Sequence, residues 1–168
     1  MILYTHGSWL PGDPRGFRVR NHRIHSSGDY NTPPPDGEHA GLYCRNQQRA
    51  PRPVVLPRAV RPALVLSIRT KCEALESRVL AIAAGKCHVH LLVEATDNYR
   101  EIKRITARIK QASSHAVRDG LPGRVWAGGG KPIRVHDQAH QRRVFHYICE
   151  HRDQGAYVWR FDEQEQGA

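Results

Sequence analysis

The chain has 168 residues, which is enough for one domain with a hydrophobic core. Its 26 Lys and Arg outnumber its 16 Asp and Glu, and the formal net charge of +10 favours a polyanionic partner such as nucleic acid. No apolar run approaches the roughly 18 residues that span a membrane, and the N-terminus lacks the pattern of a signal peptide. The spacing of the four cysteines fits neither a zinc ribbon nor a small disulfide scaffold. We therefore expect a cytoplasmic protein with reduced thiols.

The first third of the chain predicts little regular structure. Residues 2–5 are a short apolar run that predicts a strand, and residues 8–16 are dense in turn-forming residues. Residues 18–56 are polar, basic and rich in Pro and Gly, without sustained periodicity. We expect this stretch to be a loop-like insertion or arm within a single domain that spans residues 1–168.

A helix and a β-hairpin are predicted after the insertion. Apolar residues recur at helical spacing from Pro57 to about residue 75, and Pro62 suggests that the regular helix begins near it. Residues 78–84 and 87–95 are apolar and rich in β-branched side chains, and the Gly85–Lys86 pair between them is typical of a tight turn.

The next predicted element is a long basic helix. Asn98 is a suitable N-cap for a helix that runs to about Arg118. Lys103 and Lys110 lie on one shoulder of its apolar stripe, and Arg104 lies further round. These cations are either a solvated face or contacts to DNA phosphates, which position a nucleic acid without reading its sequence.

The C-terminal part completes the predicted fold. A Gly-rich turn at 128–130 precedes a predicted strand at 131–135, then a helix at about 138–152 that Asp137 could cap, and an extended segment at 156–159. Without the insertion, the order is βαββαβ plus a helix. This order predicts an α+β, ferredoxin-like (RRM-like) fold, in which an antiparallel sheet has helices packed on one face.

Two histidines on the second hairpin strand are the first candidates for a functional site. His88 and His90 flank Val89, and side chains two apart on a strand point to the same face. Their Cα atoms should lie about 6.5–7 Å apart, close enough for both imidazoles to bind one metal ion. A pair of histidines on the open face of a strand is the structural alternative.

The last predicted helix offers partners for these histidines. Val144, Phe145 and Ile148 fall on its apolar face, and Tyr147 and His151 lie next to each other on the shoulder. A shoulder position is half buried and half open. Such a position suits an active-site tyrosine and also an amphipathic tyrosine with a structural role.

Four segments in this order carry a resemblance to a known family. The run His88-Val89-His90-Leu91-Leu92-Val93 resembles the HUH motif, and Tyr147 within 145–151 resembles the motif of a single catalytic tyrosine. Segments 8–16 and 126–135 resemble two further parts of the Y1 transposase superfamily, especially its branch of REP-associated tyrosine transposases. The resemblance covers residues 1–17 and about 58–160.

The resemblance implies a metal-dependent reaction on DNA. Tyr147 would be the nucleophile, and His88, His90 and His151 would hold a divalent ion, Mg²⁺ or Mn²⁺. The substrate would be single-stranded DNA beside a hairpin or repetitive palindrome, and attack would leave a 5′-phosphotyrosine and a free 3′-hydroxyl. The residues that would contact the DNA are Lys103, Arg104, Lys110, Trp9 and Arg15. For Trp9 and Arg15, a turn packed on the core is the structural alternative. A protein of this kind would work on the nucleoid as a monomer or homodimer.

The chain departs from the family pattern at two positions that bear on the metal. His151 stands where the family usually has Asn or Gln, and Cys87 stands where it often has an acidic or amide residue. Both changes bring softer donor atoms and allow Zn²⁺. An inactive, domesticated homologue is therefore an alternative to an active enzyme.

Two other functions stay open. A ferredoxin-like sheet with a basic helix is also the plan of RNA-binding RRM modules, which stack bases on aromatic residues of the sheet. The predicted hairpin strands carry no aromatic residue, which counts against such a module. The second alternative is a metal-dependent hydrolase that activates water and leaves Tyr147 as a bystander.

Overall fold

The computed structural model describes residues 1–14, 35–49 and 52–163. The chain forms two compact units, which are described separately. One unit combines Met1–His6 with the chain from Val54 onward, and the other comprises Gly7–Pro53.

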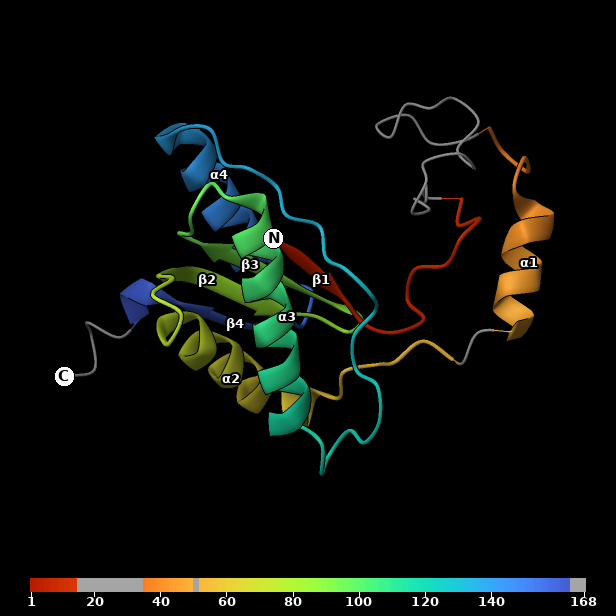
Figure 1. Cartoon of the computed structure of the whole chain (residues 1–168), viewed down its shortest axis with the longest axis horizontal. Helices are drawn as coiled ribbons and strands as arrows, with labels where there is room; N and C mark the ends of the chain where they lie inside the picture. The colour runs from red at the N-terminus through yellow and green to blue at the C-terminus, as the bar shows by residue number, and fades with distance from the viewer. Residues whose placement is uncertain (15–34, 50–51, 164–168) are drawn as a thin grey trace. The chain divides into compact units, whose positions relative to one another are not determined.

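The larger unit is built on a four-stranded antiparallel sheet (Figure 1). Its strands, in the order β1-β3-β2-β4 across the sheet, are β1 (Ile2–Tyr4), β3 (His88–Val93), β2 (Val79–Ala84) and β4 (Tyr157–Arg160). The β2–β3 hairpin forms its centre, where His90 lies between Ile2 of β1 and Ala83 of β2. The predicted α+β, ferredoxin-like fold is confirmed.

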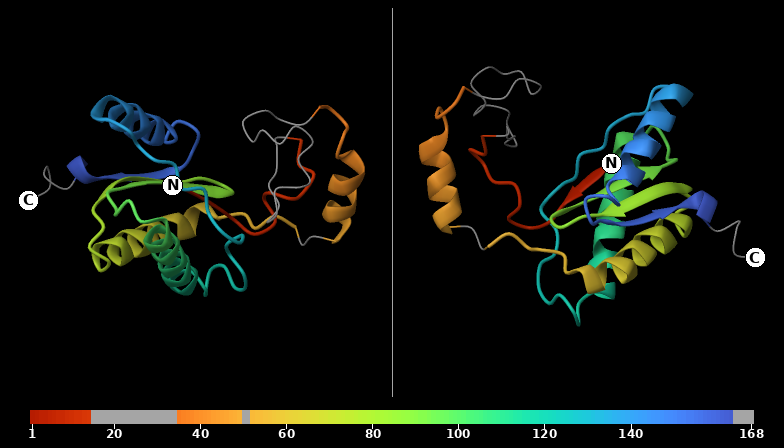
Figure 2. Two further views of the ribbon diagram at one scale, coloured as in Figure 1. Left: turned by 45° about the horizontal axis from the view of Figure 1, so that its top comes forward. Right: turned by 180° about the vertical axis from the view of Figure 1, so that it is seen from behind.

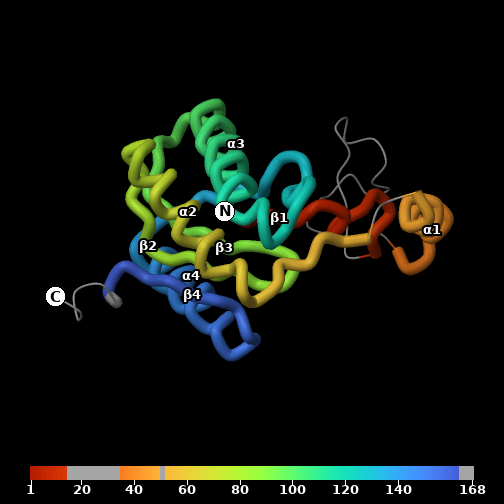
Figure 3. The backbone as a smooth tube through the Cα atoms, turned by 90° about the horizontal axis from the view of Figure 1, so that it is seen from below, coloured from red at the N-terminus to blue at the C-terminus, as the bar shows by residue number. Residues whose placement is uncertain are grey.

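Helices cover both faces of this sheet, and not one face alone as the sequence predicted (Figure 2). A short 3₁₀ turn, η1 (Arg58–Val60), leads into α2 (Arg61–Glu73), which packs beside α3 (Tyr99–Ala116) on one face. The last helix, α4 (Gln138–Glu150), lies on the opposite face, as the view in Figure 3 also shows. A 3₁₀ turn, η2 (Phe161–Glu163), follows β4. None of the helices in the described part of the chain has the length and hydropathy needed to cross a lipid bilayer.

The two faces bury separate hydrophobic clusters, because successive strand residues point to opposite sides. Beneath α2 and α3 the sheet contributes Leu3, Ile82, Val89 and Leu91, together with side chains from both helices. Beneath α4 the cluster is smaller and consists of Leu80, Ala81, Ala83, Leu92, Ile148 and Val158. The side of the sheet that carries α4 therefore has room for polar side chains.

Both predicted helix caps are present. The Asn98 side chain accepts hydrogen bonds from the backbone N–H groups of Arg100 and Glu101 at 2.9 and 3.4 Å. The Asp137 side chain accepts a hydrogen bond from the His140 N–H at 2.7 Å. Each cap satisfies N–H groups of the first helical turn that have no carbonyl partner within the helix.

The strand predicted at 131–135 is wrong. Lys131 alone forms an isolated bridge with Ile2, in which each residue donates its N–H to the other's carbonyl at 2.9 Å. Pro132 has no N–H to donate, so the ladder cannot continue in the usual way. The segment still lies beside the free edge of β1, where the last strand of a ferredoxin-like unit was expected, and β4 instead extends the opposite edge.

The smaller unit contains α1 (Ala40–Arg49), within the stretch where no regular element was expected. None of the residues of α1 is buried. A helix that buries no face needs no apolar stripe, so the sequence lacked the pattern that would predict it. The Asn46 side chain donates to the Pro11 carbonyl at 3.0 Å. Gly12 has φ +89° and packs so closely that a Cβ atom there would lie 2.6 Å from the Tyr43 nitrogen. The remainder of the predicted insertion, residues 18–34 and 50–51, lies outside the described residues.

Candidate active site

Strand β3 directs two imidazoles to the face that α4 covers. Val89 and Leu91 are fully buried in the cluster beneath α2 and α3, so the alternation of the strand turns His88 and His90 the other way. The two rings lie edge to face with their centroids 4.8 Å apart. His90 is only 7% exposed, and His88 is half-buried.

Helix α4 brings a third imidazole and a phenol to the same place. Ile148 is buried against the sheet, so Tyr147 and His151 lie on the adjacent side of the helix, as predicted from their spacing. The His151 ring centroid lies 4.4 Å from that of His90 and 6.1 Å from that of His88. The Tyr147 ring lies 5.4 Å from the His90 ring and 4.7 Å from the His151 ring.

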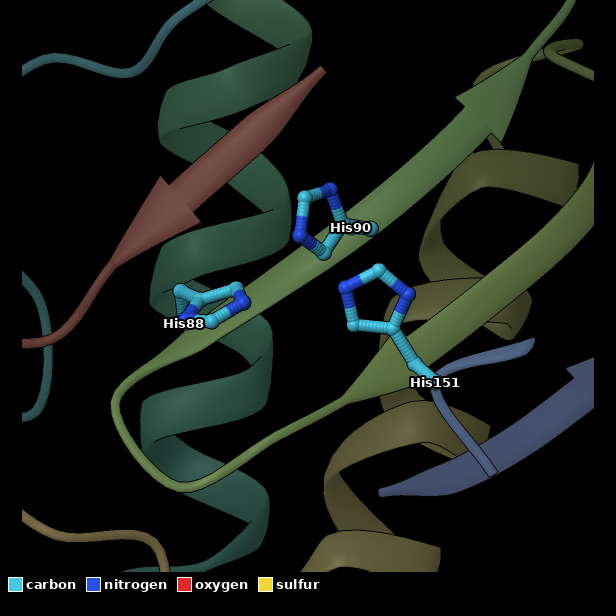
Figure 4. A group of neighbouring side chains, drawn as sticks. All are labelled: His88, His90 and His151. Atoms are coloured by element: carbon cyan, nitrogen blue, oxygen red, sulfur yellow. The ribbon is translucent and has the colours of Figure 1, made fainter. Parts of the chain in front are cut away.

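The three histidines form a group able to hold a metal ion (Figure 4). One nitrogen from each ring can be chosen so that all lie within 4.8 Å of one another. The three rings face a common point, two from β3 and one from the end of α4. Cys87 does not belong to this group. Among the described residues, the candidate metal ligands are therefore three imidazoles, without the cysteine thiolate that the sequence also suggested.

The protonation of these rings suits metal binding. Burial, together with the neighbouring His88 and His151 and the amino group of Met1, lowers the pKa of His90 to about 3. Burial and the neighbouring His151 also lower the pKa of His88. Both rings are therefore neutral at pH 7, and a neutral imidazole offers the lone pair that a metal ion requires.

A hydrogen bond fixes the tautomer and orientation of His151. Its Nδ1 lies 2.8 Å from the backbone carbonyl of Tyr147. A carbonyl only accepts hydrogen bonds, so Nδ1 carries a proton and Nε2 is the nitrogen that can offer a lone pair to a metal ion. Hydrogen bonds of this kind commonly orient the histidine ligands of metal sites.

A cavity of about 1000 Å³ opens beside these residues. His90 and Tyr147 are part of its wall. The rest comes from the end of β3 and the loop 94–97, the segment 132–137 and further α4 residues, with smaller contributions from β1, β2 and the first turn of α3. Tyr147 is 52% exposed, so its phenol is accessible to a large substrate.

The predicted basic residues of α3 lie on the other face of the sheet from the histidines. Arg104 makes a bidentate ion pair with Glu101, at 2.9 and 3.0 Å from its Nε, on the helix surface. The Lys103 ammonium lies 4.5 Å from the centroid of the Tyr99 ring, beside a separate cavity of about 560 Å³. The structure thus does not bring these two cations together with the histidines and Tyr147.

Lys110 has a structural partner that the sequence did not indicate. Its ammonium donates to the Ala127 carbonyl at 2.8 Å and also to the Gly129 carbonyl. Burial and the nearby Arg124 lower the pKa of Lys110 to about 8. It ties α3 to the Gly-rich turn that precedes the cavity-lining segment.

The two remaining predicted DNA contacts lie in the smaller unit. Trp9 is half-buried there, and Arg15 lies outside the described residues. The sequence also did not indicate that residues 132–137 form part of the cavity wall, because their pattern predicted a strand.

A family model described as IS200-like transposase matches residues 49–152, more than half of the chain. The matched region includes the three histidines and Tyr147 and ends before β4. Neither the curated proteins nor the solved structures include a match to this chain. On the strength of the family match, the chain belongs to the IS200-like transposase family, part of the Y1 transposase superfamily.

Proposed function

We propose that the protein nicks single-stranded DNA and transfers the cut strand through a 5′-phosphotyrosine at Tyr147. The substrate would be a strand next to a hairpin or repetitive palindrome, as in the branch of REP-associated tyrosine transposases. The protein would act on the nucleoid in the cytoplasm, because its substrate lies there.

The observation that carries this proposal is the placement of one accessible phenol beside three clustered imidazoles. Tyr147 contacts the rings of His90 and His151 and lines the large cavity with His90. A tyrosine with only a structural role on the helix shoulder would not require imidazole rings around it, so these neighbours favour a role in the reaction. A nucleophile for phosphoryl transfer needs both access to the phosphate and a site that stabilises negative charge.

The proposed reaction conserves the energy of the phosphodiester bond. The Tyr147 oxygen, after loss of its proton, attacks the scissile phosphorus, and the bond from phosphorus to the 3′ oxygen breaks. The products are a phosphotyrosine on the 5′ side and a 3′-hydroxyl, which takes up a proton. The 3′-hydroxyl of a second strand can then attack the phosphotyrosine and release Tyr147, so rejoining requires no ATP.

His88, His90 and His151 would hold a divalent metal ion in this reaction. When bound, the ion would polarise the scissile phosphate and neutralise the charge that develops on its oxygens. Three imidazoles favour Zn²⁺ over Mg²⁺ and Mn²⁺, which prefer oxygen ligands. The resemblance implies Mg²⁺ or Mn²⁺, so we keep these two ions and Zn²⁺ as the candidates.

Contacts to the rest of the DNA are proposed for residues away from the histidines. Lys103 is exposed and lies beside a second cavity, whereas Arg104 and Lys110 already make internal hydrogen bonds. We rank Lys103 first among the α3 residues for phosphate contact, followed by Arg104 and Lys110. Trp9 and Arg15 would contact the DNA from the smaller unit, which we propose acts as an arm of one functional domain.

A covalent adduct assay tests the proposal. Wild-type protein with hairpin-flanked, fluorescently labelled single-stranded DNA and Mn²⁺ should form a band that survives denaturing electrophoresis. Tyr147→Phe should abolish this band, because phenylalanine has no nucleophilic oxygen. Tyr157→Phe provides the matched control on β4, outside the site, and should leave adduct formation unchanged. An adduct of normal yield with Tyr147→Phe would contradict the assignment.

The same assay separates the alternatives. A binding module would retain labelled DNA without cleaving it, and a chelator would not change its affinity. A hydrolase that uses water would cleave the DNA in a reaction that depends on His88 but would leave no covalent product.

A further inference from the structure

A buried arginine joins the segment that precedes α2 to the turn that follows α4. Arg61 is the first residue of α2 and is 7% exposed. Its Nε and one terminal nitrogen donate to the Leu56 carbonyl at 3.0 and 2.9 Å. Its other terminal nitrogen donates to the Gly155 carbonyl at 2.7 Å. One guanidinium therefore holds two backbone segments that lie far apart in the sequence.

The Leu56 end of this link leads to His88 and His90. The Leu56 N–H donates to the Lys86 carbonyl at 2.8 Å, in the turn between β2 and β3. Lys86 precedes His88 by two residues, and the Gly85 N–H donates to the His88 carbonyl at 3.0 Å. The position of this turn fixes where β3 begins and therefore where its two imidazoles lie.

The Gly155 end of the link leads to His151. Residues 151–155 form the turn that ends α4, and Gly155 adopts the left-handed φ of +76° within it. The Gln154 and Ala156 N–H groups both donate to the His151 carbonyl, at 3.1 and 3.0 Å. A shift of Gly155 would therefore move the backbone that carries the His151 ring.

We propose that Arg61 is a positioning residue, which sets the separation between the His88–His90 pair and His151. The proposal rests on the metal-binding role proposed for the histidines, but it concerns their positions and not the chemistry. The physical reason is that a planar guanidinium donates in a fixed fork, so it holds both carbonyls at defined places. Metal ligands need this kind of support, because affinity depends on how well their positions are organised before binding.

The first test measures metal affinity in two matched variants. Arg61→Met keeps the apolar stem and removes every donor. Arg69→Met makes the same change on α2, where Arg69 pairs with Glu73 and stacks on Trp159 without contacting either turn. Arg61→Met should weaken Mn²⁺ or Zn²⁺ binding, measured by calorimetry on the folded protein, by about 10-fold to 100-fold. Arg69→Met should bind as tightly as wild type.

Arg61→Lys provides a rescue variant and an activity readout. A lysine can donate to one carbonyl but cannot span both, so its metal affinity should lie between those of wild type and Arg61→Met. The metal concentration that gives half-maximal adduct should rise in the same order, while the rate at saturating metal should recover. A rate that stays low at saturating metal, with unchanged metal affinity, would contradict a positioning role.

The second test needs no metal and no activity. Nuclear Overhauser contacts between the ring protons of His90 and His151 should be strong in metal-free wild type and in Arg69→Met, and weak in Arg61→Met. Unchanged contacts in Arg61→Met would overturn the inference even if wild type formed the covalent adduct. Weakened contacts would support it even if wild type formed none, so the two proposals can fail separately.

Discussion

At the scale of single residues, the site is defined by rings that are kept neutral and held in orientation. His90 is almost fully buried, and its neighbours are other imidazoles rather than carboxylates. Protonation would place a charge in a poorly solvated position next to further potential cations. The folded chain therefore disfavours protonation of His90, and the lone pair of this ring stays available to a metal ion. The same effect makes the stability of the fold sensitive to acid.

The metal-free protein should lose stability as the pH falls below about 6.5. The ordinary histidine pKa is 6.5 and the folded His90 value is about 3, so between these values the unfolded chain binds a proton that the folded chain does not. Stability therefore decreases as the pH falls through this window. Going from pH 7 to pH 5 should cost about 2 kcal/mol through this residue.

Urea denaturation in chelator at both pH values measures this effect. His90→Gln should show a smaller loss of stability on acidification than wild type. His146→Gln, which changes an exposed histidine of α4, should behave like wild type. Equal acid sensitivity in wild type and His90→Gln would show that His90 does not have the depressed pKa.

At the scale of elements, α4 is the least deeply packed part of the site. Its single fully buried side chain is Ile148, which lies in the small cluster on its face of the sheet. The larger cluster beneath α2 and α3 includes Ile68 of α2, which is fully buried. A loss of packing should consequently have different functional effects on the two faces.

Two isoleucine truncations should separate stability from site geometry. Ile148→Ala and Ile68→Ala should each destabilise the protein by about 2–4 kcal/mol, the range for large-to-small changes in a core. Ile148→Ala should also weaken metal binding at temperatures where the protein is folded, because α4 carries His151. Ile68→Ala should leave metal affinity unchanged, and calorimetry on both variants distinguishes the two effects. Equal metal affinity in both variants would argue against this role of α4 packing.

Sequence alone predicted the elements whose local signals are strong. The β2–β3 hairpin, the caps at Asn98 and Asp137 and the shared shoulder of Tyr147 and His151 all follow from short-range periodicity. The helix α1 was missed because it buries no residue, and the strand at 131–135 was wrong because Pro132 lacks a donor. Neither the position of α3 on the far face nor the link through Arg61 could be read from spacing, because both depend on long-range packing.

At the scale of the whole molecule, the cations of α3 that the sequence singled out do not lie at the histidines. Lys103 and Arg104 lie on α3, across the sheet from α4, and Arg104 is paired with Glu101. A strand that reached both Tyr147 and α3 would have to pass the edge of the sheet. The net charge of +10 favours such extended contact through phosphates rather than through bases.

Salt dependence of binding tests whether α3 takes part in that contact. For a single strand, each neutralised phosphate contributes about 0.7 to the slope of log affinity against log salt. Lys103→Ala, in a Tyr147→Phe background that cannot react, should lower the slope by about that amount. Arg104→Ala should change it less, because Glu101 already accepts hydrogen bonds from Arg104. Fluorescence anisotropy at several salt concentrations gives the slopes, and an unchanged slope for Lys103→Ala would exclude its contact.

The attachment of α4 at both ends has a consequence for how the site is assembled. The chain enters α4 after the Lys131 bridge to β1 and leaves it through β4, which pairs with β2, so opposite edges of one sheet hold the segment that contains the helix. In this structure Tyr147, the proposed nucleophile, and the three imidazoles therefore come together within one copy of the chain, and we expect dilution to separate none of them from the others.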